Sequence, residues 1–323
     1  MSGVKQPTGS FSGSSTNPTL AADGERSGSA ARPASRKRRA GPPKTSDSIA
    51  VPPPAAWFQN GFQRFLERYL RRHFHAIAIA REGHPRDQFA ALSRQTGETN
   101  PLQDPDLPML VYSNHPGWWD PLIAQFANHR LFMPRQFYAP IDAEALQQYR
   151  VFEKLGFFGV EPHTSRGAAS FLRVTSELFQ RPHTALWMTP EGRFADPRDH
   201  EAELMPGLAH VCTRLTSGWI VPMALEYVFW EERLPECLMK VGECVSLKEY
   251  PDRDKAAWAA DLQHRLRQVQ SQLSRLAIAR RSEPFENLLQ GKQGARGVYD
   301  MARRVKSLLT GRRFQAAHGD QFR

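Results

Sequence analysis

Long apolar runs are missing from this sequence: no stretch approaches the ~20 apolar residues of a membrane-spanning helix, so we expect none. The first residues lack the apolar core of a secretory signal, so we also expect no cleaved leader. Cysteines are scarce and have no paired spacing, which argues against a disulfide framework or a zinc site and fits a reducing compartment; they are Cys212, Cys237 and Cys244. The motif G-x-S-x-G is absent too, which argues against a lipase-like serine hydrolase.

Positive charge, by contrast, is abundant. The 323 residues carry a formal net charge of +10, which predicts an anionic partner such as a membrane surface, a nucleic acid or a phosphorylated substrate. The length allows one large domain or two small ones.

Basic segments lie near both termini. Residues 1–54 are rich in Ser, Gly, Pro and Ala, so we expect a disordered basic tail. Its run Arg36-Lys37-Arg38-Arg39 is interpreted as a solvated stretch, as a contact for anionic lipid or as a contact for nucleic acid. Residues 282–323 form a second basic extension, in which we expect a short basic helix at 299–309, packed against the domain or against lipid.

Residues 55–82 contain the strongest amphipathic pattern. Large apolar residues recur at helical steps, with arginines between them: Phe58, Phe62, Phe65, Leu66, Tyr69 and Leu70 against Arg64, Arg68, Arg71 and Arg72. This pattern is typical of a helix in the membrane interface, and an ordinary helix packed on the domain is the open alternative. Ala76–Ala80 extends the apolar content but is too short to cross a bilayer.

A His and an Asp lie together at a predicted strand-to-helix corner. Apolar residues 109–112 predict a buried strand and residues 122–127 predict a helix, with His115 and Asp120 between them. In a continuous helix, residues five apart point about 140° away from each other. Pro116 and Gly117 break that path, so Asp120 can fold back onto one imidazole nitrogen and leave the other as a base. The alternative is a buried His capped by a nearby Asp.

The rest of residues 83–281 alternates predicted strands and helices. We expect strands at 109–112, 130–133, 155–160, 184–188, 219–225 and 238–245, and helices at 140–152, 165–180, 207–217 and 258–276. This order predicts an α/β fold with a largely parallel central sheet flanked by helices. In such a fold the site lies at the carboxyl ends of the strands.

Three short blocks in order resemble the glycerolipid acyltransferase superfamily, which includes the lysophosphatidic acid (1-acylglycerol-3-phosphate) acyltransferases. His115 and Asp120 match its catalytic H-x4-D motif, Pro190-Glu191-Gly192 its P-E-G block and Val221-Pro222 its fourth block. The resemblance covers roughly residues 105–230 and implies a glycerolipid-acyltransferase-like fold. It gives Asn114, Pro190 and Pro222 structural roles at the site.

The blocks linked to the acceptor's phosphate depart from the family pattern. The usual basic residue after the Gly-aromatic strand is replaced by Glu161-Pro162, and the nearest arginines, Arg166 and Arg173, are displaced. Arg193 follows Gly192 directly, where the family usually has an intervening Thr. The acceptor-binding residues implied by the resemblance are Glu191, Gly192 and Arg193, with Arg166 or Arg173; a simple surface role is the alternative for Arg166.

The resemblance implies acyl transfer in lipid metabolism, specifically phospholipid biosynthesis. His115, oriented by Asp120, would be the general base that moves a fatty acyl group from acyl-CoA or acyl carrier protein to a hydroxyl of a lysophospholipid-like acceptor. We expect no metal, no bound cofactor and no nucleic-acid partner, and a cytoplasmic protein peripheral on the cytoplasmic face of an anionic membrane. The alternatives are a non-phosphate lipid hydroxyl (glycolipid, carotenoid or amino-lipid) as acceptor, or a non-catalytic membrane or nucleic-acid binding protein.

Overall fold

A nine-stranded sheet forms the centre of the fold in the computed structural model, which describes residues 51, 56–97, 99–104, 106–292 and 321–322. The strand order is β4-β3-β5-β2-β6-β7-β1-β9, and β8 pairs with β6. The strands are β1 (Ala76–Ala80), β2 (Met109–Ser113), β3 (Gln136–Asp142), β4 (Phe157–Val160), β5 (Thr184–Met188), β6 (Trp219–Val228), β7 (Glu236–Val241), β8 (Val245–Ser246) and β9 (Phe285–Gln290). The predicted tail, apart from Val51, and the predicted helix at 299–309 lie outside the described residues.

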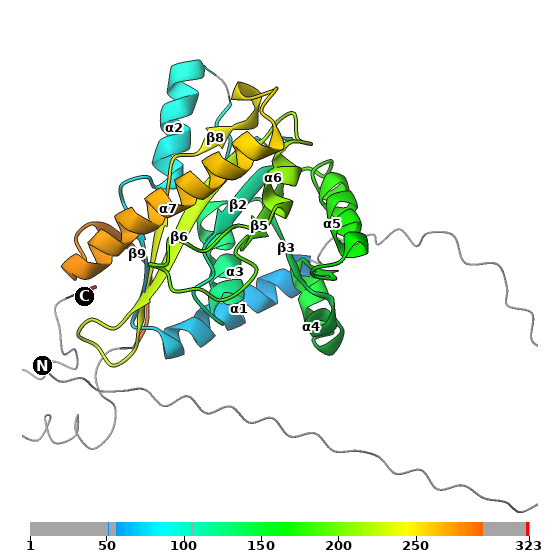
Figure 1. The fold of residues 1–323 in the computed structure, drawn as a ribbon. Helices are drawn as coiled ribbons and strands as arrows, with labels where there is room; N and C mark the ends of the chain where they lie inside the picture. Colours follow the sequence, from blue (N-terminus) through cyan, green and yellow to red (C-terminus); the bar gives the residue numbers. More distant parts are fainter. Residues whose placement is uncertain (1–50, 52–55, 98, 105, 293–320, 323) are drawn as a thin grey trace, which may run out of the picture. The chain divides into compact units, whose positions relative to one another are not determined.

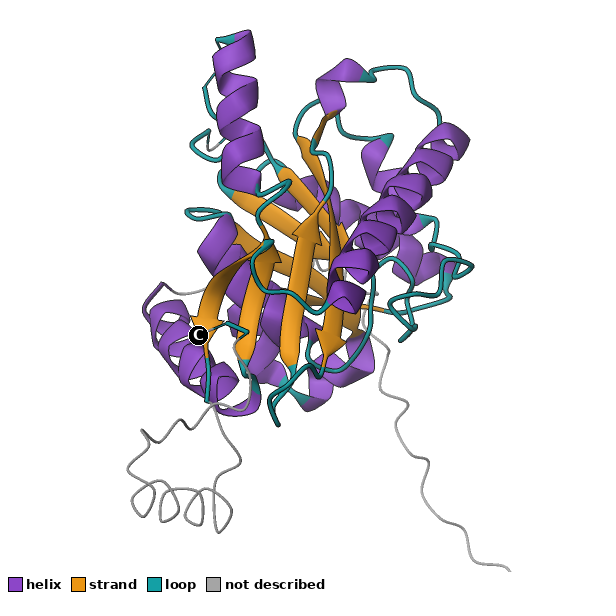
Figure 2. Cartoon of the chain, turned by 90° about the vertical axis from the view of Figure 1, so that its left-hand side faces the viewer, coloured by secondary structure: helices purple, strands orange, loops and turns teal. Residues whose placement is uncertain are grey.

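Helices cover both faces of this sheet. They are α1 (Ala56–His73), α2 (Pro85–Thr96), α3 (Asp120–Leu131), α4 (Ala143–Gln148), α5 (Ser165–Leu178), α6 (Gly207–Cys212) and α7 (Lys255–Ala279), with 3-10 turns η1 (Arg150–Leu155) and η2 (Leu247–Glu249). Figure 1 shows α7 running across one face, and Figure 2 shows helices on both sides of the strands. Among the described helices, none has the length and apolarity needed to cross a bilayer.

The sheet is mostly parallel, as predicted. Strands β4, β3, β5, β2 and β6 pair in parallel, as do β1 and β7, whereas β6–β7, β6–β8 and β1–β9 are antiparallel. Parallel strands covered on both faces are apolar throughout because neither face meets water. All five residues of β2 are accordingly buried.

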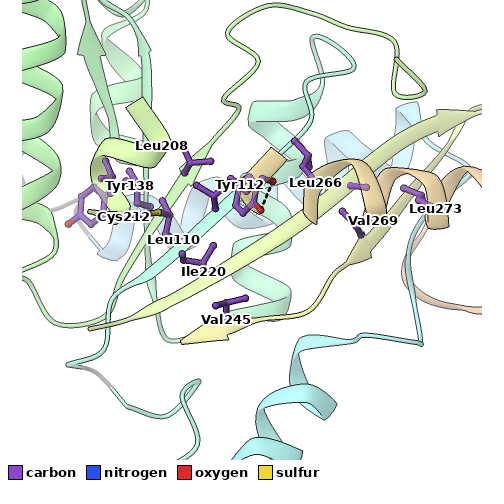
Figure 3. Packing of buried hydrophobic residues seen from close by; sticks show 14 of the residues in the cluster. Leu110, Tyr112, Tyr138, Leu208, Cys212, Ile220, Val245, Leu266, Val269 and Leu273 are labelled. Atoms are coloured by element: carbon purple, nitrogen blue, oxygen red, sulfur yellow. Dashed lines mark hydrogen bonds between the residues drawn. The ribbon is translucent and has the colours of Figure 1, made fainter. Parts of the chain in front are cut away.

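Two hydrophobic clusters, one on each face, hold the layers together. Leu110 and Tyr112 of β2 pack with residues of α5, α6 and α7, whereas Met109 and Val111 pack with residues of α1, α2 and α3. Figure 3 shows the first cluster, in which Tyr112 lies beside Leu266 of α7. The Tyr112 hydroxyl donates to the Leu262 carbonyl at 3.0 Å, so this buried polar group is satisfied.

Pro222 lies inside β6, where a missing N–H would normally break the ladder. On the side of β6 away from β2, β8 pairs with Trp219 and Ile220 and β7 pairs from Met223 onward. Pro222 therefore falls in the gap between two partners, and its carbonyl still accepts from Gly242 N at 2.9 Å. This explains how an apolar run interrupted by one proline forms a central strand.

Several predicted elements have different bounds in the structure. Residues 130–133, predicted as a strand, are the end of α3 and the turn after it, and the strand begins at Gln136. The helix predicted at 140–152 begins only at Ala143, because Asp142 caps it by accepting from Glu144 N and Ala145 N. Most of the remaining elements differ by a few residues at one or both ends: the helix predicted at 207–217 is the shorter α6, the strand predicted at 238–245 is the shifted β7, and the helix predicted at 258–276 is the longer α7.

The sheet extends beyond the predicted domain limits of 83–281. Ala76–Ala80, which we had grouped with the amphipathic helix, is β1, and it lies between β7 and β9. Phe285–Gln290, grouped with the basic extension, is β9. These limits were wrong because neither short segment is recognisable as a strand without its distant partner.

Helix α1 packs on the domain through one side and is open to solvent on the other. Leu66 and Leu70 are fully buried, whereas Trp57 and Phe65 are 78% and 57% exposed. The predicted helix is therefore confirmed, and its packed side matches the alternative of an ordinary domain helix. The exposed aromatic residues on its outer side are not explained by that packing.

Candidate active site

The carboxyl end of β2 is tied to β6 by Asn114. Its side-chain amide donates to the Leu225 carbonyl at 2.9 Å, and its side-chain oxygen accepts from Leu225 N at 2.8 Å. Asn114 is 1% exposed, so both bonds are protected from water. This pair of hydrogen bonds fixes the backbone immediately before His115.

His115 and Asp120 meet at the predicted corner. His115 Nδ1 lies 2.5 Å from Asp120 Oδ2, and the backbone N–H of Gly117 donates to the same oxygen at 3.1 Å. Asp120 begins α3 and is 2% exposed, whereas the His115 side chain is 19% exposed. Because Nδ1 is engaged, Nε2 is the ring nitrogen left for a substrate.

Tyr227, which the sequence did not identify, completes the environment of Asp120. Tyr227 lies near the end of β6, and its hydroxyl donates to Asp120 Oδ1 at a distance of 2.5 Å. Burial, followed by the nearby Cys237 and Asp120, raises the pKa of Tyr227 well above 10, so the phenol stays protonated. Asp120 thus accepts three hydrogen bonds, from a ring nitrogen, a backbone amide and a phenol.

Glu191 holds His115 from the other side, through the backbone. Its Oε2 accepts from His115 N at 2.8 Å, and its Oε1 accepts from Arg267 Nη1 of α7 at 2.7 Å. Arg267 also donates to Gln270 Oε1 at 2.6 Å and to the Ala202 carbonyl. Glu191 is 5% exposed and both of its carboxylate oxygens accept bonds within the protein, so its contact with an acceptor stays a prediction.

The segment after β5 closes over His115. Gly192 N donates to the Thr189 carbonyl at 3.1 Å, and the carbonyl of the buried Pro190 accepts from Met205 N at 2.7 Å. Gly192 has φ of +63°, a left-handed conformation that favours glycine. Because its N–H is used inside this turn, Gly192 contributes to the site through its shape.

Phe194 lies directly against the His115 ring, with ring centroids 4.6 Å apart and an edge-to-face arrangement. It is nevertheless 60% exposed. Ala195 N donates to the His115 carbonyl at 3.1 Å, so the same segment also fixes the His115 backbone. No sequence pattern points to Phe194, because a single aromatic residue in a loop carries no specific signal.

A cavity of about 320 Å³ opens beside His115 at the carboxyl ends of β2, β3 and β5. Its described lining is mainly apolar and contains neither Arg nor Lys. The lining residues are Ser113, His115, Asp120, Pro121, Ala124, Phe137, Ala139, Pro140, Ile141, Asp142, Phe157, Trp187, Met188, Thr189 and Gly192. The position agrees with the predicted location of a site in a parallel α/β sheet.

The predicted phosphate-binding arginines are not gathered at this cavity. The Arg193 side chain is 63% exposed, and its Nη2 lies 3.9 Å from Asp199 Oδ2. Arg166 and Arg173 are exposed on α5, Arg166 in its first turn. Gly192 is therefore the one predicted acceptor residue that lines the cavity, and the role of the arginines stays a prediction.

Arg267 could have been found from the pattern of α7. The apolar residues of α7 recur at helical spacing and predict the helix. A polar stripe lies beside them, formed at three- and four-residue spacing by Arg267, Gln270 and Ser274. All three are 9% exposed or less. Gln270 donates to the Pro197 carbonyl at 2.8 Å and Ser274 to Glu226 Oε2 at 3.1 Å, so this stripe faces the site.

Comparison with known proteins gives a family match over part of the chain. Residues 92–226 match the family model described as Acyltransferase. No curated protein matches the chain. The matched segment contains His115, Asp120 and Glu191 but ends one residue before Tyr227, and Arg267 lies well beyond it.

Proposed function

From the match of residues 92–226 to the Acyltransferase family model, we propose that the chain is an acyltransferase whose acceptor is a lysophospholipid-like hydroxyl. The acyl donor would be a thioester, either acyl-CoA or acyl carrier protein. The observation that carries this proposal is the 2.5 Å contact between His115 Nδ1 and Asp120 Oδ2 beside an apolar cavity. That arrangement suits a base that acts on a hydroxyl next to a bound acyl chain.

In the proposed reaction, His115 Nε2 takes the proton of the acceptor hydroxyl while the oxygen attacks the thioester carbonyl carbon. The carbon–sulfur bond then breaks, and the departing thiolate takes the proton back from the imidazolium. Asp120 stabilises the transient imidazolium through Nδ1, which is the role a buried carboxylate plays beside a catalytic His. No step requires a serine nucleophile, a metal or a bound cofactor.

The cavity supports the acyl part of this proposal. Phe137, Ile141, Phe157 and Trp187 give it apolar walls, and each buried methylene of a chain contributes roughly 0.8 kcal/mol. Polar groups lie at His115, Asp120 and Thr189. An acyl chain inside the cavity would bring its thioester to these polar groups.

The acceptor is the part for which we propose two candidates. A phosphate-bearing lysophospholipid would be recognised by Arg193, with Arg166 or Arg173, outside the cavity. The absence of Arg and Lys from the described cavity lining favours the second candidate, a non-phosphate lipid hydroxyl such as that of a glycolipid, carotenoid or amino-lipid. A non-catalytic membrane or nucleic-acid binding role would leave the His115–Asp120–Tyr227 arrangement without a purpose.

A peripheral position on the cytoplasmic face of an anionic membrane is also proposed, through α1. Exposed Trp57 and Phe65 lie on the same helix as four exposed arginines: Arg64, Arg68, Arg71 and Arg72. The ring centroids of Tyr69 in α1 and Trp119 lie 5.9 Å apart, and the neighbouring Trp118 is 65% exposed. Aromatic side chains and arginines arranged in this way suit the headgroup region and would bring the corner close to lipid.

The test is release of free thiol from palmitoyl-CoA with and without lysophosphatidic acid or a neutral monoacylglycerol. We expect acceptor-dependent release by the wild-type chain and a loss of roughly 10²–10⁴-fold in His115→Ala, the usual contribution of a general base. Circular dichroism would show that the variant is folded. Acceptor-dependent release that survives in His115→Ala would contradict the proposed mechanism.

A further inference from the structure

Tyr227 is linked to His115 through Asp120 in one hydrogen-bonded network, although it lies 107 residues after Asp120 and outside the family-matched segment. We propose that Tyr227 is a positioning residue of the transfer reaction, which fixes the carboxylate of Asp120 and sets how much of its charge reaches His115. This inference rests on the proposed function. It assigns a role to a residue that the family match does not cover.

The first part of the argument is geometric. Gly117 N and His115 Nδ1 both use Oδ2 of Asp120, so Oδ1 would have no described partner without the Tyr227 hydroxyl. Asp120 is 2% exposed, and a buried carboxylate oxygen that loses a hydrogen bond is costly. Donors on both oxygens hold the carboxylate plane in one orientation, with Oδ2 directed at His115.

The second part is electrostatic. Burial keeps Tyr227 as the neutral phenol, so it always donates to the carboxylate. A hydrogen bond to a charged acceptor is short and strong and draws negative charge toward the donor. The hydrogen bond from Tyr227 concentrates negative charge on Oδ1 and leaves less of it on Oδ2, which faces His115. Tyr227 therefore lowers the basicity of His115 while it aligns the carboxylate of Asp120.

Other ionisable groups on neighbouring elements face the hydrogen-bonded network of His115, Asp120 and Tyr227. Glu191 and Arg267 reach His115 through its backbone N–H, and Asp142 lies across the cavity. Cys237 of β7 is paired in register with Tyr227, and burial raises the pKa of its thiol, so it stays neutral. A Tyr227 substitution leaves all of these groups in place, which makes its effect on pH dependence attributable to Asp120.

Tyr227→Phe is the decisive variant because it removes one oxygen and keeps the ring, which packs 6.0 Å from the Phe74 ring. We expect kcat to fall roughly tenfold, with the KM values for donor and acceptor nearly unchanged, as for an interaction used in the transition state. We also expect the acidic limb of the kcat/KM profile to move to higher pH by up to about one unit, since His115 would face a more negative carboxylate.

Tyr112→Phe is the matched control. It also removes a buried tyrosine hydroxyl, one that bonds to the Leu262 carbonyl at 3.0 Å, and it does not touch Asp120. We expect a lower thermal midpoint and an unmoved acidic limb. An unmoved limb in Tyr227→Phe, or a kcat equal to that of the wild type, would overturn the proposal.

Two further measurements separate this proposal from the proposed function. In an Asp120→Asn background, Tyr227→Phe should cost little additional activity, because the two residues act as one unit; full additivity would contradict a shared role. NMR titration of the His115 ring in the substrate-free chain should show a higher midpoint in Tyr227→Phe. If the wild type transfers no acyl group but the midpoint moves, the proposed function fails and the coupling of Tyr227 to His115 stands; an unmoved midpoint refutes that coupling whatever the activity.

Discussion

The corner that carries His115 and the arginines predicted to bind a phosphate are held in very different ways. At the corner, Asp120 and Glu191 are 2% and 5% exposed, and every oxygen of their carboxylates accepts a bond from a named donor. Arg193, by contrast, is 63% exposed, and its described acidic partner lies 3.9 Å away. The two regions are neighbours in sequence, since Glu191 and Arg193 are separated by one residue.

The proposed function gives a physical reason for this difference. A base has to be aligned before the substrate arrives, because alignment lost in the transition state slows the reaction. Cationic side chains that wait for an anion repel one another, so they remain extended in water until the anion is present. On the proposed function, the folded chain contains a fully hydrogen-bonded corner at His115 beside arginines that only a bound substrate would order.

Substitution of Arg267, the partner of Glu191, should have the largest effect, and this effect is on the free energy of unfolding. Arg267→Met leaves the carboxylate of Glu191 buried without its cation, and loss of one partner of a buried pair costs about 3–5 kcal/mol in free energy of unfolding. Urea denaturation would measure the loss. The control is Arg267→Met combined with Glu191→Gln, which removes the buried charge as well and should recover much of the stability. A double variant no more stable than Arg267→Met would contradict the paired role.

Glu236 is a buried carboxylate outside the His115 corner, and it can be compared with Glu191. It is 1% exposed, but it accepts from the Trp230 backbone N–H at 3.1 Å instead of from a guanidinium. Burial raises the pKa of Glu236 to about 7, so the folded chain favours the protonated acid. The contribution of Glu236 to the free energy of unfolding should be greatest below pH ~4.5, fall as pH rises toward about 7 and level off above that, by on the order of 3 kcal/mol.

Glu236→Gln has no charge to bury, so the contribution of Glu236 to the fall in stability through that pH window should be absent from the variant. Thermal unfolding from pH 4.5 to pH 8 would compare the two chains. A wild type and a Gln variant with parallel stability curves would show that burial of Glu236 does not control this pH dependence.

The arginines are the region where a smaller effect is expected. If Arg193 contacts an acceptor phosphate only in the complex, Arg193→Ala should lower kcat/KM for lysophosphatidic acid roughly ten- to a hundredfold through one lost charged hydrogen bond. The folded chain should keep its stability, because the side chain is exposed. Arg166→Ala and Arg173→Ala, tested alongside, would identify the second contact. Equal losses on lysophosphatidic acid and on a neutral monoacylglycerol would favour the non-phosphate acceptor.

The smallest expected effect concerns the membrane. Trp57→Ser with Phe65→Ser removes exposed aromatic area from α1, and we expect a several-fold loss of flotation with vesicles that contain anionic lipid. Ile278→Ser is the matched control, since Ile278 is 64% exposed on α7, which packs on the opposite face of the sheet. Added salt should weaken binding through Arg64 and Arg68. Equal losses in the control and the α1 variant would contradict docking through this helix.

Local patterns predicted much of this structure. Helices α1, α5 and α7 follow apolar residues at helical spacing, and the corner at His115 and Asp120 follows from a strand, a Pro-Gly break and a helix in succession. Residues that depend on distant partners were not predictable in the same way. The polar stripe of α7 marks Arg267 but not its partner, and Tyr227 carries no local signal; both matter because β6 and α7 bring them to Asp120 and Glu191.

Strand β1 has a consequence for how the chain is made. Its five alternating Ala and Ile residues are fully buried between β7 and β9, both of which lie much later in the sequence. At a synthesis rate of about 5–20 residues per second, β1 leaves the ribosome roughly 10–30 s before Glu236–Met239 are available to pair with it. During that interval this apolar segment has neither neighbour, so the nascent chain is a candidate substrate for a chaperone that shields exposed strands.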